Sequence, residues 1–187
     1  MRLLRVAWLL IAAALIQACL VVSLHPVYSA ETIAFDAALV GNWIGDEESA
    51  TVTFERAEWL SYHLVFTDSG KTTRLSGRLT RVGDLQLLDV SPLHGTDIPD
   101  LQIPVHGIYK IAIDGDTLSA AALNYDHFFA MAKAGKTEAG LLLDARKNAV
   151  LTASTPDLRQ WLLAHETDEG LFDAPMVFRR KVGETVP

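Results

Sequence analysis

The chain has 187 residues and carries 16 lysine and arginine against 23 aspartate and glutamate side chains, which gives a formal net charge of −7. Its length suits a single domain, and an acidic chain without a basic stripe is a poor candidate for binding nucleic acid. It contains one cysteine, so no disulfide can form within it. Its stability in an oxidising compartment must therefore come from a packed hydrophobic core.

An export signal is the first pattern along the chain. Arg2 and Arg5 form a positively charged segment, and the apolar run after them has the length of the hydrophobic part of a secretory signal rather than of a membrane span. The run ends at Cys19, directly after the small residue Ala18. The last four residues, Ile-Gln-Ala-Cys, resemble the lipobox of bacterial lipoproteins, in which the cysteine is acylated and becomes the first residue of the mature chain. The resemblance implies a signal peptide over residues 1–18 and a lipid anchor on Cys19.

Two other interpretations of the N-terminus stay open. Residues 6–24 are nearly all apolar, and a membrane span needs about 20 such residues, so this stretch can also remain as an uncleaved anchor. Ordinary signal cleavage near Ala30 would instead remove Cys19. With a lipid on Cys19, burial of acyl chains contributes about 0.8 kcal/mol per methylene and holds the protein at the membrane. Because Leu20 rather than an aspartate follows the cysteine, the resemblance implies the outer membrane of a two-membrane bacterium, with the domain facing the periplasm.

Beyond the anchor the chain changes to short alternating strands. Residues 19–38 are expected to form a lipidated linker, because His25 and Pro26 interrupt any regular pattern. In residues 39–182, runs of alternating polarity are separated by turn signals roughly every 8 to 12 residues, which predicts an antiparallel sandwich or barrel. The tail, residues 183–187, is expected to be flexible. The expected early strands are Thr51–Glu55, Tyr62–Phe66, Thr73–Thr80 and Leu85–Val90, followed by Val105–Ile113 and Thr117–Leu123.

The second half of the chain adds two predicted helices. Three prolines make Ser91–Pro104 a long loop, and Asp114-Gly-Asp116 is the strongest hairpin signal of the chain. One helix is expected over Tyr125–Lys136, and another over Pro156–Glu166, which begins with proline after a hydroxyl cap. The strand Met176–Lys181 closes the domain. The predicted fold class is therefore mainly β, with an antiparallel barrel of about eight strands and two short helices in the later half, after an N-terminal signal helix.

The start of the first strand carries a family resemblance. Gly41-Asn-Trp43 resembles the glycine-x-tryptophan signature of lipocalin-like barrels, and about eight strands follow it. The resemblance implies that Trp43 closes one end of the barrel and that an arginine of the last strand, Arg179 or Arg180, packs across its ring. Such a stack contributes roughly 0.5 to 2 kcal/mol, and Gly41 lets the chain enter the barrel floor without a Cβ clash. The alternative is another β-sandwich or barrel whose tryptophan merely fills the core.

A second resemblance covers the whole mature stretch. The segments Ser23–Pro26, Phe35-Asp36, Gly41–Trp43 and Leu151–Ser154 are similar to those of a group of uncharacterised bacterial lipoproteins. This resemblance implies the same location and fold, and it implies no activity.

The sequence offers no motif for catalysis or for a cofactor. It contains no glycine-rich phosphate loop, no Gly-x-Ser-x-Gly elbow and no His-Glu-x-x-His pair. Its histidines form no pair at a spacing of two, three or four residues, so no metal site is expected. A metal set of His94 and His106 with Asp97 or Asp100 would need the proline-rich loop to fold back. The six histidines are His25, His63, His94, His106, His127 and His165.

A catalytic triad is not expected either. Ser91, His94 and Asp89 are close in sequence, but neighbours along an extended chain point in different directions and cannot preset a nucleophile, a base and an orienting group. Asp114 and Asp116 have a simpler role in the chemistry of a turn. The sequence therefore predicts a protein that is not an enzyme and has no cofactor.

The first function that fits this chain is binding. The mouth of the barrel would receive a small apolar or amphipathic molecule, because barrel mouths are favoured places for such pockets. Eight strands leave an interior just wide enough for one small ligand, so the same side chains can also simply fill the core. The expected lining residues are Tyr62, Leu64, Phe66, Leu75, Leu87, Ile108, Tyr109 and Ile111.

The second function is that of an interaction or structural protein of the cell envelope. Held at the membrane by Cys19, the domain would present the loop Ser91–Pro104 and the helix Tyr125–Lys136 to a protein partner. Phe128 and Phe129 would be the anchors of that contact if they are exposed.

Overall fold

The computed structural model describes residues 20–46, 50–93 and 103–181. The predicted signal helix, Cys19 and the tail lie outside the described residues. No helix within the described ranges is long and apolar enough to cross a membrane.

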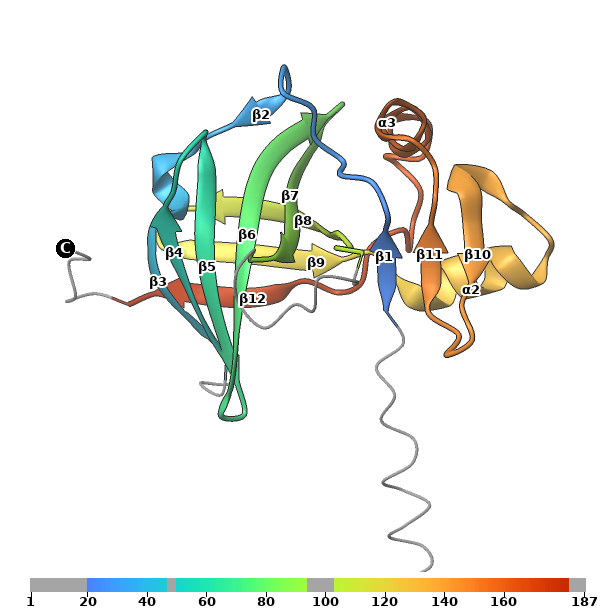
Figure 1. The fold of residues 1–187 in the computed structure, drawn as a ribbon. Helices are drawn as coiled ribbons and strands as arrows, with labels where there is room; N and C mark the ends of the chain where they lie inside the picture. Colours follow the sequence, from blue (N-terminus) through green and yellow to red (C-terminus); the bar gives the residue numbers. More distant parts are fainter. Residues whose placement is uncertain (1–19, 47–49, 94–102, 182–187) are drawn as a thin grey trace, which may run out of the picture.

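A closed antiparallel barrel of eight strands forms the main body, on the left of Figure 1. Strands that follow one another in the sequence pair with each other, and β12 pairs with β3 to close the ring. Closure leaves none of these strands as an edge, and the predicted fold class is confirmed. The strands are β3 (Gly41–Gly45), β4 (Ala50–Arg56), β5 (Ser61–Asp68), β6 (Lys71–Val82), β7 (Leu85–Pro92), β8 (Gly107–Asp114), β9 (Thr117–Ala122) and β12 (Met176–Arg180).

Glycines with left-handed φ form two hairpin turns of the barrel, one of them at the predicted Asp114-Gly-Asp116 turn. Gly70 lies between β5 and β6 with φ of 79°, and Gly115 lies between β8 and β9 with φ of 56°. These left-handed values match hairpin turns, in which glycine avoids the clash that a Cβ would cause.

A second layer lies beside the barrel, on the right of Figure 1, and most of it is inserted between β9 and β12. In it β1 pairs in parallel with β11, and β10 pairs with β11 on the other side. The two predicted helices are confirmed here, although each ends two or three residues earlier than expected. The elements of this layer are β1 (Val21–Ser23), α2 (Tyr125–Lys133), η2 (Glu138–Gly140), β10 (Leu141–Leu143), β11 (Ala149–Leu151) and α3 (Thr155–Ala164).

The segment expected to be a linker is part of the fold from Leu20 onward. It contributes β1, then β2 (Ile33–Ala34), which pairs with β6, and η1 (Ala37–Leu39). Val27 within it is fully buried. The sequence pattern misses this because β1 pairs with residues about 130 positions away, and so short a strand has no periodicity of its own.

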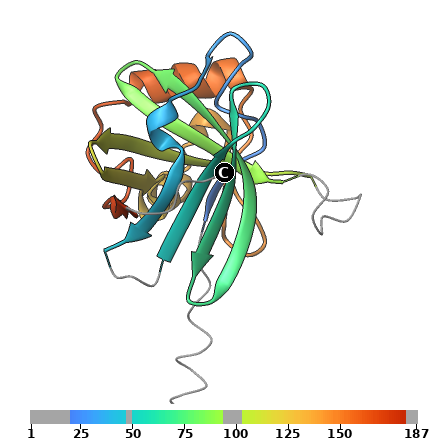
Figure 2. The ribbon, with the colours of Figure 1, turned by 90° about the vertical axis from the view of Figure 1, so that its left-hand side faces the viewer.

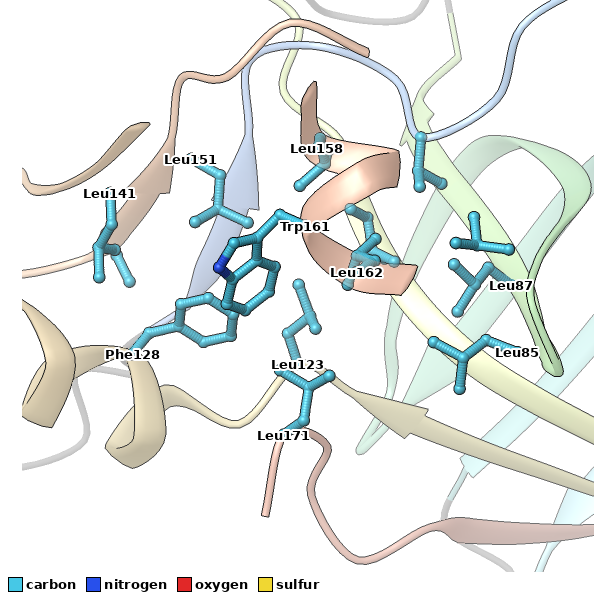
Figure 3. Packing of buried hydrophobic residues seen from close by; sticks show 14 of the residues in the cluster. Leu85, Leu87, Leu123, Phe128, Leu141, Leu151, Leu158, Trp161, Leu162 and Leu171 are labelled. Carbon is cyan, nitrogen blue, oxygen red and sulfur yellow. The ribbon is translucent and has the colours of Figure 1, made fainter. Parts of the chain in front are cut away.

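Two hydrophobic cores follow from the alternation of side chains along the strands. On β7, Leu88 and Val90 face the barrel interior, whereas Leu85 and Leu87 face the second layer. Figure 3 shows the second core, in which Trp161 of α3 lies among leucines from both layers. Both faces of β7 are therefore apolar, because each is covered.

Candidate functional site

The tryptophan of the glycine-tryptophan motif packs in the core of the barrel. The ring of Trp43 is fully buried, and its Nε1 donates to the Leu39 carbonyl at 2.9 Å. The Arg180 guanidinium lies over this ring, with Cζ 4.1 Å from the centroid. A Cβ on Gly41, whose φ is 136°, would lie 3.0 Å from Arg180 Nη1, so glycine makes room for the stack.

Arg180 and its neighbour Arg179 have different environments. Arg180 also donates to the carbonyls of Ala38 and Val40, at 2.7 and 3.1 Å, and so ties the last strand to η1. Arg179 lies on the outer surface, where its side chain is 71% exposed and pairs with Asp46. Of the two candidates, Arg180 is therefore the one that lies over the tryptophan.

The eight expected ligand-binding residues divide between the two cores. Six belong to the core of the barrel, where Tyr62, Leu64 and Ile111 are buried and Phe66, Leu75 and Tyr109 are partly buried. Leu87 and Ile108 face the second layer instead. Alternation alone could not separate them, because both faces of β7 and β8 carry apolar side chains.

A hollow with a volume of about 1030 Å³ lies outside the barrel. Its floor is the outer face of β5, β6 and β7, which presents Ser61, His63, Ser76, Arg78 and Ser91. None of the eight residues expected to bind a ligand lines it. We call this hollow the outer groove; its other lining residues are Pro26, Tyr28, Arg56, Ala57, Glu58, Trp59, Pro92, Leu93, Pro104 and His106.

A buried carboxylate lies beside the groove. Asp89 is 2% exposed, its Oδ2 accepts from the Val27 N–H at 2.8 Å, and its Oδ1 lies 2.6 Å from His106 Nδ1. Because a carboxylate only accepts hydrogen bonds, Nδ1 carries the proton in this pair. The backbone of His106 is fixed as well, through two hydrogen bonds with Ser23. The pair therefore holds the segment after β1 against β7 and β8.

The groove also contains an arginine without a carboxylate partner. The guanidinium of Arg78 lies over the ring of Tyr28, with Cζ 5.1 Å from the centroid, and Nη1 lies 3.5 Å from Ser76 Oγ. No carboxylate of the described residues lies within 4.0 Å of it. Burial raises the pKa of Tyr28, against a smaller opposing effect of Arg78, so this phenol remains a donor at neutral pH.

The turn between β4 and β5 presents an exposed tryptophan at the edge of the groove. Ser61 N donates to the Glu58 carbonyl at 3.2 Å, and the two residues between them, Trp59 and Leu60, have φ of 56° and 57°. Glycine and asparagine usually occupy such positions, and each larger residue there costs roughly 1–2 kcal/mol. Trp59 is nevertheless 83% exposed. A strained turn that holds a large aromatic side chain in solvent is typical of a functional surface.

Proximity along the chain does not reveal the Asp89–His106 pair. It groups Asp89 with Ser91 and His94, whereas in the structure Asp89 contacts His106, 17 residues away. Asp89 shares a strand face with Leu85 and Leu87, and a charge on an apolar face predicts a buried partner. That signal was present in the sequence.

The remaining candidate residues are those for a metal site and those for contact with a protein partner. Among residues 20–46, 50–93 and 103–181, no three histidine, cysteine, aspartate or glutamate side chains come together as metal ligands. The loop residues His94, Asp97 and Asp100 lie outside the described residues. Of the two expected protein-binding anchors, Phe128 is fully buried in the second core and Phe129 is partly buried, stacked on Tyr125.

No model of a known protein family matches the chain, and no curated protein or solved structure is significantly similar to it.

Proposed function

We propose that this chain is a membrane-anchored bacterial lipoprotein whose domain binds a small amphipathic molecule in the outer groove. The observation that carries the proposal is the groove itself, edged by a strained turn that exposes Trp59. The apolar part of the ligand would lie against Trp59, Pro92 and Leu93, and its polar part against the serines and arginines of the floor.

Packing supports the groove over the barrel interior as the binding place. The interior is occupied by large buried side chains, among them Trp43, Tyr62 and Phe178. A ligand there would have to displace them, which repacks a dense core. The groove needs no such change, because its lining side chains already surround open space. Binding inside the barrel stays a prediction of the sequence alone.

The lipid anchor rests on the lipobox resemblance and is tested by Cys19→Ala. We expect this variant to leave the membrane fraction and to lose acylation-dependent processing, because Cys19 is the only thiol available. Fractionation of cells and the mass of the purified chain measure both effects. A full-length variant that stays with the membrane would favour the uncleaved anchor instead.

The turn at the edge of the groove tests the binding itself. The variant Trp59→Asn with Leu60→Gly replaces both left-handed residues with ones that tolerate this conformation. We expect the free energy of unfolding to rise by about 1–2 kcal/mol as strain is removed. We also expect loss of the small molecules that copurify with the wild-type protein, measured by mass spectrometry of an organic extract.

Leu60→Gly alone is the matched control for this variant. It removes strain at one position and keeps Trp59, so it should gain part of the stability and retain the bound molecules. If the double variant retains them too, the groove is not their binding place. Gain of stability with loss of ligand is the signature of a turn shaped by function rather than by folding.

A further inference from the structure

We infer that the outer groove recognises a carboxylate group of its ligand, and that Arg78 is the residue that binds it. The inference rests on the proposed function, since it names the ligand class of the same groove. It comes from the contrast between Arg78 and the other partly buried arginines of the chain.

The other partly buried arginines use their donors within the protein. Arg159 donates to the Val27 carbonyl, the Thr80 hydroxyl and the Arg81 carbonyl, at 2.8, 3.2 and 2.8 Å. Arg180 donates to Asp116 and to two carbonyls of the segment around η1. Each guanidinium therefore satisfies a structural role with at least three acceptors.

Arg78 differs from them in position and in partners. Alternation on β6 directs it outward, into the groove, because Leu79 beside it faces the barrel core. Its guanidinium contacts Ser76 Oγ and the Tyr28 side chain, and it has no carboxylate of the described residues within 4.0 Å, although Asp89 lies opposite it on β7. A guanidinium has five N–H donors, so most of those on Arg78 are available to a ligand. Stacking on an aromatic ring leaves the edge of the guanidinium free for a planar acceptor.

The charge of the groove favours an anion. Its lining holds two arginines, Arg56 and Arg78, and one carboxylate exposed on it, Glu58, whereas the whole chain has a net charge of −7. Asp89 lies behind the groove, where the Val27 N–H and the His106 ring already donate to its carboxylate. Positive side chains in this hollow attract anions, although the protein as a whole is acidic. A guanidinium without an ion-pair partner matches a group with a single negative charge, and a carboxylate fits its fork in a bidentate manner.

The test compares two probes that share a phenyl ring and a four-carbon chain and differ in the head group, the anionic 4-phenylbutanoate and the neutral 4-phenylbutan-1-ol. Binding to the full chain, held in nanodiscs of zwitterionic lipid, is measured by equilibrium dialysis against empty discs. We expect the wild type to bind the carboxylate at least tenfold more tightly than the alcohol. Arg78→Gln should abolish this difference by weakening the carboxylate about tenfold while leaving the alcohol unchanged.

Three further variants keep the outcomes separate. Arg74→Gln removes the same charge from the same strand outside the groove and should change neither affinity. Arg78→Lys keeps the charge without the fork and should lose part of the preference. The turn variant Trp59→Asn with Leu60→Gly should weaken both probes equally, because it removes the apolar contact.

Several results would overturn the inference. Equal affinities of the two probes for the wild type, or no binding of the carboxylate at millimolar concentration, would remove carboxylate recognition. An Arg78→Gln variant that weakens both probes alike would mean that Arg78 only shapes the groove. Loss of carboxylate binding in discs that contain phosphatidylglycerol would assign the site to a lipid phosphate instead. Unchanged binding of both probes by the turn variant would contradict the proposed function itself.

Discussion

Trp43→Ala is expected to lower the free energy of unfolding by about 3–5 kcal/mol. The ring is fully buried in the core of the barrel, so its removal leaves a cavity that the surrounding strands cannot fill. The variant also loses the hydrogen bond to the Leu39 carbonyl and the stack with Arg180. Urea unfolding followed by circular dichroism measures the change.

Two other tryptophan variants make this measurement specific. Trp43→Phe keeps most of the side-chain volume and should lower the free energy of unfolding much less. This variant can be measured even if the alanine variant does not fold. Trp59→Ala removes an equally large side chain from an exposed position and should change stability little. If Trp43→Ala costs less than 1 kcal/mol, the tryptophan does not hold the barrel together.

Asp89→Ala is expected to lower the free energy of unfolding by about 2–4 kcal/mol. It leaves the buried N–H of Val27 without an acceptor and removes the 2.6 Å contact with His106, and each buried polar group left without a partner costs roughly 1–3 kcal/mol. Thermal and urea unfolding both report the loss. Because the segment after β1 forms part of the groove, the variant should also weaken the binding that we propose for the groove.

His106 provides the matched test of this pair. His106→Ala leaves Asp89 buried with its charge only partly compensated, so a comparable loss is expected. The double variant should lose less than the sum of the two single losses, because the two residues share one interaction. Asp116→Ala is the control, since its carboxylate is 75% exposed and its pair with Arg180 should contribute little. Strict additivity of the Asp89 and His106 variants would mean that the two side chains act independently.

The barrel was predictable because its signals are local. Alternation along β4 to β9 and the glycine of the Asp114-Gly-Asp116 hairpin act over a few residues, and they give the right strands and turns. The second layer gives weaker signals. Its helices follow from a proline after Ser154 and from apolar spacing, but β1 and β11 have three residues each and meet only through the fold.

The groove could not be predicted in the same way. It joins residues from five separate stretches, and none of them carries a motif for binding. Glu58-Trp59-Leu60-Ser61 reads as an ordinary polar and apolar mixture, since left-handed φ at a tryptophan and a leucine has no propensity signal. Asp89 is the exception, because an acid on the same strand face as Leu85 and Leu87 marks a buried partner.

The pairing of β1 has a mechanical consequence for a lipid-anchored protein. Leu20 already donates to the Asn148 side chain and accepts from the Ala149 N–H, at 3.3 and 2.9 Å. A lipid on Cys19 would thus be attached directly beside the folded domain, with no flexible linker between them. Such a domain would stay at the bilayer surface, because no extended segment would let it reach outward, and any molecule that the groove binds would have to come to that surface.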